Sequence, residues 1–196
     1  MLDNNLVIEK KEAAYTPIPE NMYNVELLDI TSEKRPTYDT RALPDDQKEY
    51  ETVFNFQFVL LDGEENGKSL RGRSLWMNFV PSYLYIGKNG KNDLYQIVEA
   101  LQRQTMSPQQ EAEGITGAYL NSLVGKHTRV ATENKTKGDK TYSQIVKFYG
   151  ASSGLVALTA DEKEKATPKN KDAAAQAAVD AAYEGDEIKP EDIPFN

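Results

Sequence analysis

The chain has no cysteine, one histidine and one tryptophan among its 196 residues. Without cysteine there is no disulfide framework, no thiol nucleophile and no cysteine-based metal site. No apolar run approaches the roughly 20 residues that a membrane-spanning helix needs, so we expect no membrane partner. The first residues lack the basic start and apolar stretch of a signal peptide. These absences lead us to expect a cytoplasmic protein.

The sequence also lacks the residue patterns of a catalytic or metal site. His127 lies in a predicted strand, where an ordinary sheet-face residue explains it better than a metal ligand. The run Gly63-x-x-x-Gly67-Lys68 has neither the length nor the following helix of a phosphate-binding loop. Carboxylates lie in loops and near the C-terminus without a convergent pair. We therefore expect no enzyme activity, no catalytic residues, no metal and no cofactor.

The negative charge is concentrated at one end of the chain. The net charge is -8, and residues 159–196 account for -5 of it, with 10 acidic and 5 basic side chains. Residues 1–158 therefore carry only -3, with 21 acidic and 18 basic side chains. This balance excludes a strongly basic domain but allows a local basic groove.

Alternation of apolar and polar residues predicts five strands. The clearest run begins at Tyr50 and places Phe54, Phe56, Phe58 and Leu60 on one face, where we expect them to fill the core. The predicted strands are 22–31, 50–62, 68–79, 126–133 and 140–149.

Helical spacing of Leu94, Ile97, Val98 and Leu101 predicts one main helix over 93–104, and a shorter helical stretch follows at 115–124. The segment between these two helices is polar, contains a proline and is predicted to be a link. Residues 32–48 are polar and are expected to form a long mobile loop. Residues 134–139 contain Gly138 and favour a hairpin turn.

Three strands, a helix and two strands are the order of elements in an OB-fold, a five-stranded Greek-key barrel with a helix between strands 3 and 4. A small mixed sheet with one helix gives the same order. We therefore expect a mainly β OB-fold followed by a disordered C-terminal tail. The expected divisions are an extended lead-in at 1–21, the OB-fold domain at 22–150, a low-complexity linker at 151–184 and an acidic tip at 185–196.

An OB-fold holds single-stranded nucleic acid with a basic groove and aromatic platforms, because every nucleotide has a phosphate and a stacking face. Arg71 and Arg73 are expected on one face of the third strand, with Trp76 on the other. The first long loop and the last hairpin are the usual gripping elements, although lysines at a hairpin also suit a solvated turn. The candidate binding residues are Arg35, Arg41, Arg71, Arg73, Trp76, Lys135, Lys137, Lys140, Tyr142 and Lys147.

The C-terminal tip combines acidic residues with one apolar group. Prolines keep it extended, and we expect Phe195 to enter an apolar pocket of a partner while acidic groups meet a basic rim. An ordinary solvated acidic terminus is the alternative. The tip resembles that of bacterial single-stranded DNA-binding proteins, although Lys189 and Pro190 dilute the acidic run and Asn196 follows the phenylalanine. The matching residues are Glu191, Asp192, Ile193, Pro194 and Phe195.

With its opening strand at 23–30, its Phe-x-Phe-x-Phe strand and Leu123-Val124-Gly125-Lys126, the chain resembles phage-type single-stranded DNA-binding proteins. This resemblance implies sequence-independent coating of single-stranded DNA in replication, recombination or repair, inside a bacterial host if a phage encodes the chain. It also implies recruitment of replication or recombination proteins through the tip. A phage structural or adaptor protein on the same barrel and a recombination-linked annealing factor or nuclease accessory are the alternatives. No oligomeric state is indicated.

Overall fold

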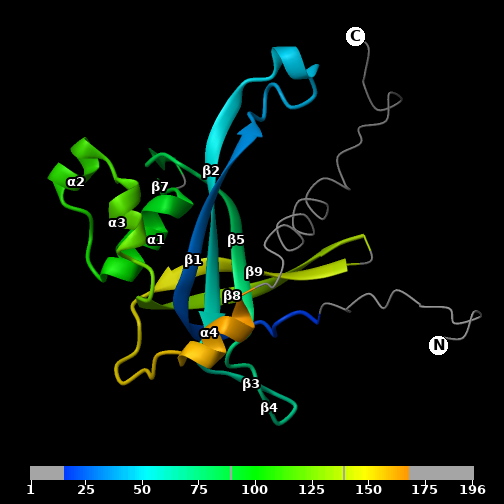
Figure 1. Ribbon diagram of the computed structural model, residues 1–196, viewed down its shortest axis with the longest axis vertical. Helices are drawn as coiled ribbons and strands as arrows, with labels where there is room; N and C mark the ends of the chain where they lie inside the picture. The colour runs from blue at the N-terminus through cyan, green and yellow to red at the C-terminus, as the bar shows by residue number, and fades with distance from the viewer. Residues whose placement is uncertain (1–15, 89, 139, 168–196) are drawn as a thin grey trace, which may run out of the picture.

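The computed structural model describes residues 16–88, 90–138 and 140–167. Five strands form one antiparallel sheet in the order β5-β2-β1-β8-β9 (Figure 1). Their bounds are β1 Met22–Pro36, β2 Tyr50–Leu60, β5 Ser74–Pro81, β8 His127–Lys137 and β9 Lys140–Tyr149. Two small hairpins pair β3 Glu64–Glu65 with β4 Lys68–Ser69 and β6 Ile86–Gly87 with β7 Gly90–Lys91. The helices are α1 Asp93–Gln102, α2 Pro108–Glu113, α3 Gly117–Asn121 and α4 Ala160–Ala166, with a 3-10 turn, η1, at Asp45–Gln47.

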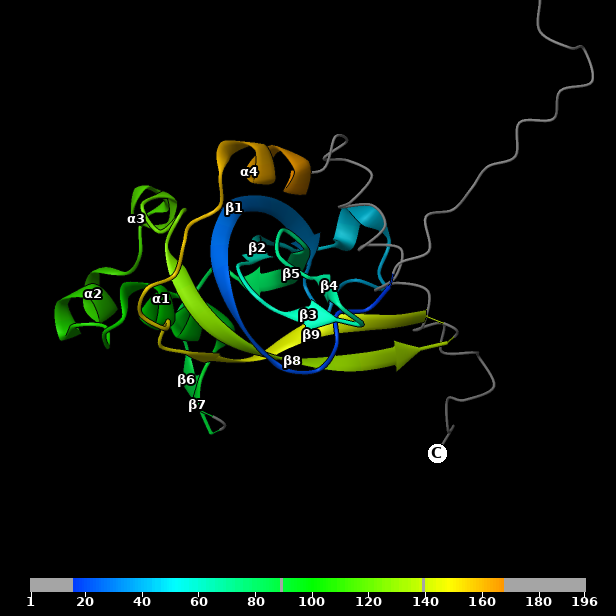
Figure 2. The ribbon, with the colours of Figure 1, turned by 90° about the horizontal axis from the view of Figure 1, so that it is seen from below.

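The expectation of a mainly β protein is confirmed. Figure 2 shows the sheet curling strongly, with β1 following the curve. Cα atoms of the edge strands β5 and β9 come within 8 Å of each other. No ladder of hydrogen bonds joins these two edges among the described residues, so the sheet is not closed.

The core lies between the inner face of the sheet and α1. Phe56, Phe58 and Leu60 are fully buried, as the alternation in β2 predicts, and the Phe58 ring lies 5.8 Å from that of Phe148 on β9. The predicted helix is confirmed as α1, and its apolar residues Leu94, Ile97, Val98 and Leu101 are all buried. Asn92 starts α1 because its side chain accepts a hydrogen bond from the Tyr95 amide.

The first part of the expected loop at 32–48 belongs to β1 instead. Residues 32–36 pair in register with residues 50–54 of β2, so the two strands form a long projecting arm. Ser32 and Lys34 of this segment are exposed, whereas Glu33 and Arg35 are half-buried, and a continuous polar run of this kind does not distinguish a strand from a loop. Only residues 37–49, which include η1, form the connection at its tip.

The third predicted strand, 68–79, is also revised. Its first residues, Lys68 and Ser69, form β4, which pairs with β3 in a short hairpin. The chain then turns through Gly72, whose φ of 88° suits glycine, before β5 begins at Ser74. Arg71 and Arg73 therefore lie in a turn rather than on one face of a strand.

Two further boundaries differ from the predictions. The polar link before the second helix contains α2, which begins with a capping box between Ser107 and Gln110 and has Pro108 in its first turn. Strand β8 extends to Lys137, so it ends only three positions before β9 begins at Lys140. The last hairpin is consequently a longer arm than expected.

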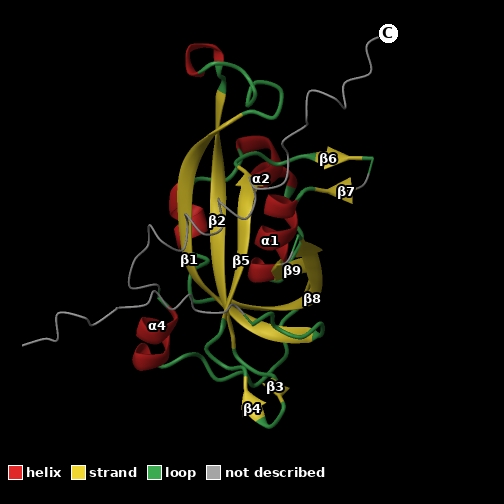
Figure 3. Cartoon of the chain, turned by 90° about the vertical axis from the view of Figure 1, so that its right-hand side faces the viewer, coloured by secondary structure: helices red, strands yellow, loops and turns green. Residues whose placement is uncertain are grey.

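Residues 155–166, hereafter the strap, pack against the outer face of the sheet, within the segment predicted to be a linker. Leu158 is 5 % exposed and joins a second apolar cluster with Val59 and Leu61. The side chain of Gln57 on β2 donates to the carbonyl of Ala166 at 2.8 Å. Figure 3 shows α4 on the opposite side of β1 and β2 from α1, so the sheet is covered on both faces.

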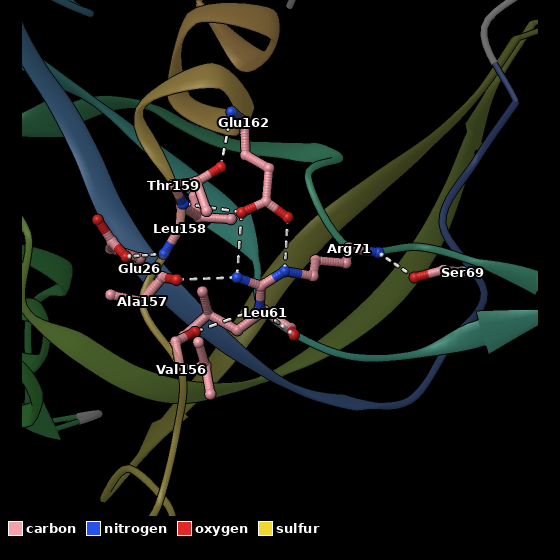
Figure 4. A network of polar contacts seen from close by, with 9 residues as sticks. All are labelled: Glu26, Leu61, Ser69, Arg71, Val156, Ala157, Leu158, Thr159 and Glu162. Carbon is pink, nitrogen blue, oxygen red and sulfur yellow. Dashed lines mark hydrogen bonds and ion pairs between the residues drawn. The ribbon is translucent and has the colours of Figure 1, made fainter.

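Arg71 fastens the strap to the body of the protein (Figure 4). Its Nε and Nη2 donate to the carboxylate of Glu162 at 2.7 and 3.2 Å. Its two Nη atoms also donate to the carbonyls of Leu61, Val156 and Ala157 at 2.9 to 3.2 Å. The N–H groups of the planar guanidinium thus donate to groups within the fold itself.

A buried carboxylate makes a second attachment. Glu26 on β1 is fully buried, and its Oε2 accepts from the Leu158 amide at 3.1 Å. Lys163 Nζ lies 2.5 Å from the other carboxylate oxygen, and His127 Nε2 lies 3.2 Å from Oε2. A buried charge is costly without partners. The contacts of Glu26 with Leu158 and Lys163 of the strap and with His127 therefore fix the position of the strap relative to β1 and β8.

The Arg71–Glu162 contact predicts a pH dependence of stability. Hydrogen bonding to Arg71 and to the Thr159 amide lowers the pKa of Glu162 from 4.5 to about 2. The resulting stabilisation is present above pH 4.5 and is lost as the pH falls through about 2, because the folded state then binds the proton it excluded. We expect Glu162→Gln to destabilise the protein at pH 7 and to lose that effect between pH 4.5 and 2 in urea unfolding. A difference in stability between the wild type and Glu162→Gln that stays constant from pH 4.5 to 2 would contradict this role of the Arg71–Glu162 contact.

Candidate nucleic-acid interface

Three lysines and a tyrosine share one face of the β8–β9 arm, hereafter the hairpin face. Lys135 stands opposite Tyr142 and Lys137 stands opposite Lys140 in the ladder. Side chains alternate along each strand, so all four point to the same side. The lysines are exposed and Tyr142 is half-buried. The structure therefore brings together four of the predicted binding residues.

The opposite face of this arm is used to anchor it. Thr136 and Thr141 hydrogen-bond across the strands at 3.1 Å, and Ser143 donates to the Asn134 side chain at 2.9 Å. The Ser143 hydroxyl also accepts from the amide of Ile18, in the lead-in before β1, at 2.6 Å. The arm is thus held from one side and presents its basic side to solvent.

Lys147 lies farther along the same side of the arm. An irregularity between Ala131 and Thr132 leaves Ala131 opposite Lys147 and Arg129 opposite Tyr149. Lys147 Nζ lies 5.2 Å above the Tyr149 ring, a cation–π contact. Lys147, another of the candidate binding residues, therefore extends the basic side of the arm toward the body, and Glu133 is an acidic side chain on the same side.

The outer face of β5 carries two partly exposed aromatic rings. Trp76 stands opposite Gln57 of β2, whose side chain faces away from the core. Phe79 lies three residues farther along, and the Arg35 guanidinium from β1 lies 3.5 Å from its ring centroid. Trp76 and Arg35 are predicted residues, but Phe79 is not. It was missed because regular alternation in β5 does not reveal a backbone irregularity at this position.

Arg41 lies apart from these groups, at the tip of the β1–β2 arm. Its guanidinium lies 4.3 Å from the ring centroid of Tyr38, which is 75 % exposed. Figure 1 shows this tip and the tip of the β8–β9 arm projecting from the body in different directions. A strand of nucleic acid that contacts both arms must cross the body of the protein between them.

Arg71 and Arg73 are not part of this surface. Arg71 holds the strap, as described above. Arg73 donates to the carbonyl of Thr16 and has an Nη1 that lies 4.0 Å from the carboxylate of Glu65. These internal contacts argue against a role for either arginine as a phosphate ligand.

The predicted partner-binding residues, Glu191, Asp192, Ile193, Pro194 and Phe195, lie outside the described residues. Within the described part of the chain, no helix is both long and apolar enough to cross a membrane. The same residues contain no group of three or more histidine or acidic side chains arranged to hold a metal ion.

Comparison with known proteins leaves the interface to be interpreted from its own chemistry. No protein-family model matches the chain. No curated protein matches it either.

Proposed function

We propose that the protein binds single-stranded DNA without sequence preference, as a binding protein rather than an enzyme. The observation that carries the proposal is the hairpin face, where three exposed lysines accompany Tyr142 on one side of a projecting arm. Lysines contact phosphates whatever the base sequence, and aromatic rings stack on any base. Such a surface is suited to a flexible single strand whose bases are unpaired.

The arrangement of the strands supports an OB-fold as the framework. An OB barrel is five-stranded and partly open, and this sheet has five strands whose edges β5 and β9 approach without pairing. Helix α1 lies between the third and fourth long strands in sequence. In this fold the surface of strands 2 and 3 binds oligonucleotides together with the first and last hairpin loops. Trp76, Arg41 and the hairpin face belong to those elements.

We further propose that the C-terminal tip recruits proteins of DNA replication, recombination or repair. Its sequence supports this, because Phe195 follows acidic residues and prolines that favour an extended peptide. The expected partner surface is an apolar pocket with a basic rim.

Binding of fluorescently labelled oligo-dT, followed by anisotropy at low salt, tests the proposed function. We expect submicromolar affinity for oligo-dT, similar affinity for a mixed-sequence strand, and much weaker binding to a duplex of the same length. Stacking supports this preference, because bases in a duplex are already stacked on each other. Absence of binding at low salt would refute the proposal and favour a structural or adaptor role.

A further inference from the structure

Two tyrosines in the segment after β5 expose their rings to solvent. The side chains of Tyr83 and Tyr85 are 55 % and 58 % exposed, whereas Leu84 between them is half-buried and packs against the core. Ile86, which begins β6, is also 58 % exposed. Figure 3 shows the β6–β7 hairpin projecting from the body beside α1, on the side away from α4. Neighbouring exposed apolar side chains of this kind are typical of binding surfaces.

The N-cap residue of α1 fixes the backbone that carries the two rings. The side-chain nitrogen of Asn92 donates to the Tyr83 carbonyl at 2.7 Å, and its side-chain oxygen accepts from the Tyr85 amide at 3.4 Å. The backbone amide of Asn92 also donates to the Tyr85 carbonyl at 2.9 Å. Because Asn92 also caps α1, the tyrosines are attached to a helix that packs in the core. Aromatic rings on a fixed backbone lose less conformational entropy when a ligand binds.

Gly87 allows the Tyr85 ring to lie against the β6–β7 hairpin. A Cβ atom at this position would lie 2.6 Å from Cε1 of the ring, whereas packed carbon atoms are separated by about 3.5–4.0 Å. The Tyr85 side chain remains more than half exposed. Glycine at this position therefore supports one part of the ring and leaves the rest accessible to a ligand.

The charge of this segment favours an anionic ligand. Residues 81–92 contain two lysines and no acidic residue, although the whole chain has a net charge of -8. Lys91 Nζ lies 2.7 Å from the carboxylate of Glu99, whereas Lys88 is exposed. Each nucleotide of a single strand combines a negative phosphate with a base that can stack on an aromatic ring. Exposed tyrosines in a segment without acidic residues therefore fit single-stranded nucleic acid.

We propose that Tyr83 and Tyr85 form a second site for the bound single strand, where bases stack on the tyrosine rings. This inference rests on the proposed function and deepens it, because it assigns base contacts to two residues outside the hairpin face. Figures 1 and 2 show the β6–β7 hairpin and the tip of the β8–β9 arm on different sides of the body. A single strand that contacts both sites therefore passes across the body of the protein.

Oligo-dT affinity of full-length variants, measured across a salt series, tests this inference. We expect Tyr83→Ala/Tyr85→Ala to weaken binding at least tenfold, because stacking on two rings is lost. The salt slope should stay unchanged, because neither ring neutralises a phosphate. Tyr83→Phe/Tyr85→Phe keeps both rings and should bind like the wild type. Ile86→Ala removes an equally exposed aliphatic side chain, so it is the matched control and should also bind normally. The thermal midpoint checks that each variant folds.

Photocrosslinking distinguishes a direct base contact from an indirect effect of the substitutions. Oligo-dT that carries a photoreactive thymine analogue should crosslink to Tyr83 or Tyr85 of the wild type, as identified by tandem mass spectrometry. If the wild type binds oligo-dT, any of three results would overturn this inference alone. These results are unchanged affinity of the double alanine variant, an equal loss in Ile86→Ala, and crosslinks confined to other residues. Failure of the wild type to bind oligo-dT would overturn both proposals.

Discussion

Ending the chain after Gly150 is expected to lower the free energy of unfolding by about 3 kcal/mol, whereas ending it after Thr167 is expected to leave that energy unchanged. The shorter chain lacks the strap and exposes the cluster of Val59 and Leu61. Burial of a leucine side chain such as Leu158 contributes about 2 kcal/mol, and the loss of the paired Arg71–Glu162 contact adds to it. The longer chain retains every strap contact described above.

Urea unfolding of the two shortened chains and the full-length protein measures this difference. Leu158→Ala in the full-length protein provides a second variant, because it removes buried apolar contacts and leaves the polar attachments of the strap in place. We expect it to cost about 2 kcal/mol. Equal stability of all these chains would show that the strap does not contribute to the fold and that the domain ends near residue 150.

The second large effect is expected from the hairpin face. Replacing Lys135, Lys137 and Lys140 together with alanine should weaken oligo-dT binding about a hundredfold near 0.1 M salt, because three phosphate contacts are lost. The fold should be unaffected, since these lysines are exposed at the end of the arm. Fluorescence anisotropy measures the affinity, and the thermal midpoint checks the fold.

A matched variant distinguishes local contacts from total charge. Lys68, Lys88 and Lys126 are exposed lysines outside the β8–β9 arm. Replacing these three with alanine changes the net charge by the same amount and should weaken binding far less. Equal losses in the two triple variants would contradict a localised interface on the hairpin face.

Much of the core could be predicted from local patterns. The alternation that begins at Tyr50 and the helical spacing after Asp93 identify β2 and α1 because each element buries one continuous face. Strand β9 was also predicted at its observed bounds, because a turn containing glycine precedes its strand-like run, although that turn is shorter than predicted. These signals depend on residues close together in sequence.

The strap could not be predicted in this way. Its composition from Thr159 onward is charged and typical of a solvated linker, and its stability comes from contacts distant in sequence. The Arg71–Glu162 pair joins residues 91 positions apart, and the Leu158 amide reaches Glu26 across 132 positions. Arg71 was consequently expected at a DNA surface, although the fold uses its donors internally.

The interface was predictable only in part. The lysines of the last hairpin are visible in the sequence because a glycine turn separates two strand-like runs, and their common face follows from the register. Phe79 was not visible, since it depends on a bulge in which Asn55 replaces a ladder hydrogen bond. Tertiary constraint rather than local preference sets that conformation.

The salt dependence of oligo-dT binding by the full-length protein tests the central claim most directly. The account predicts tight binding at low salt and a plot of log K against log salt with a slope of about -2 or steeper, because each single-strand phosphate contact contributes about -0.7. Duplex of equal length should bind much more weakly throughout the series. A flat salt dependence, equal binding to duplex, or no binding at the lowest salt would contradict the account.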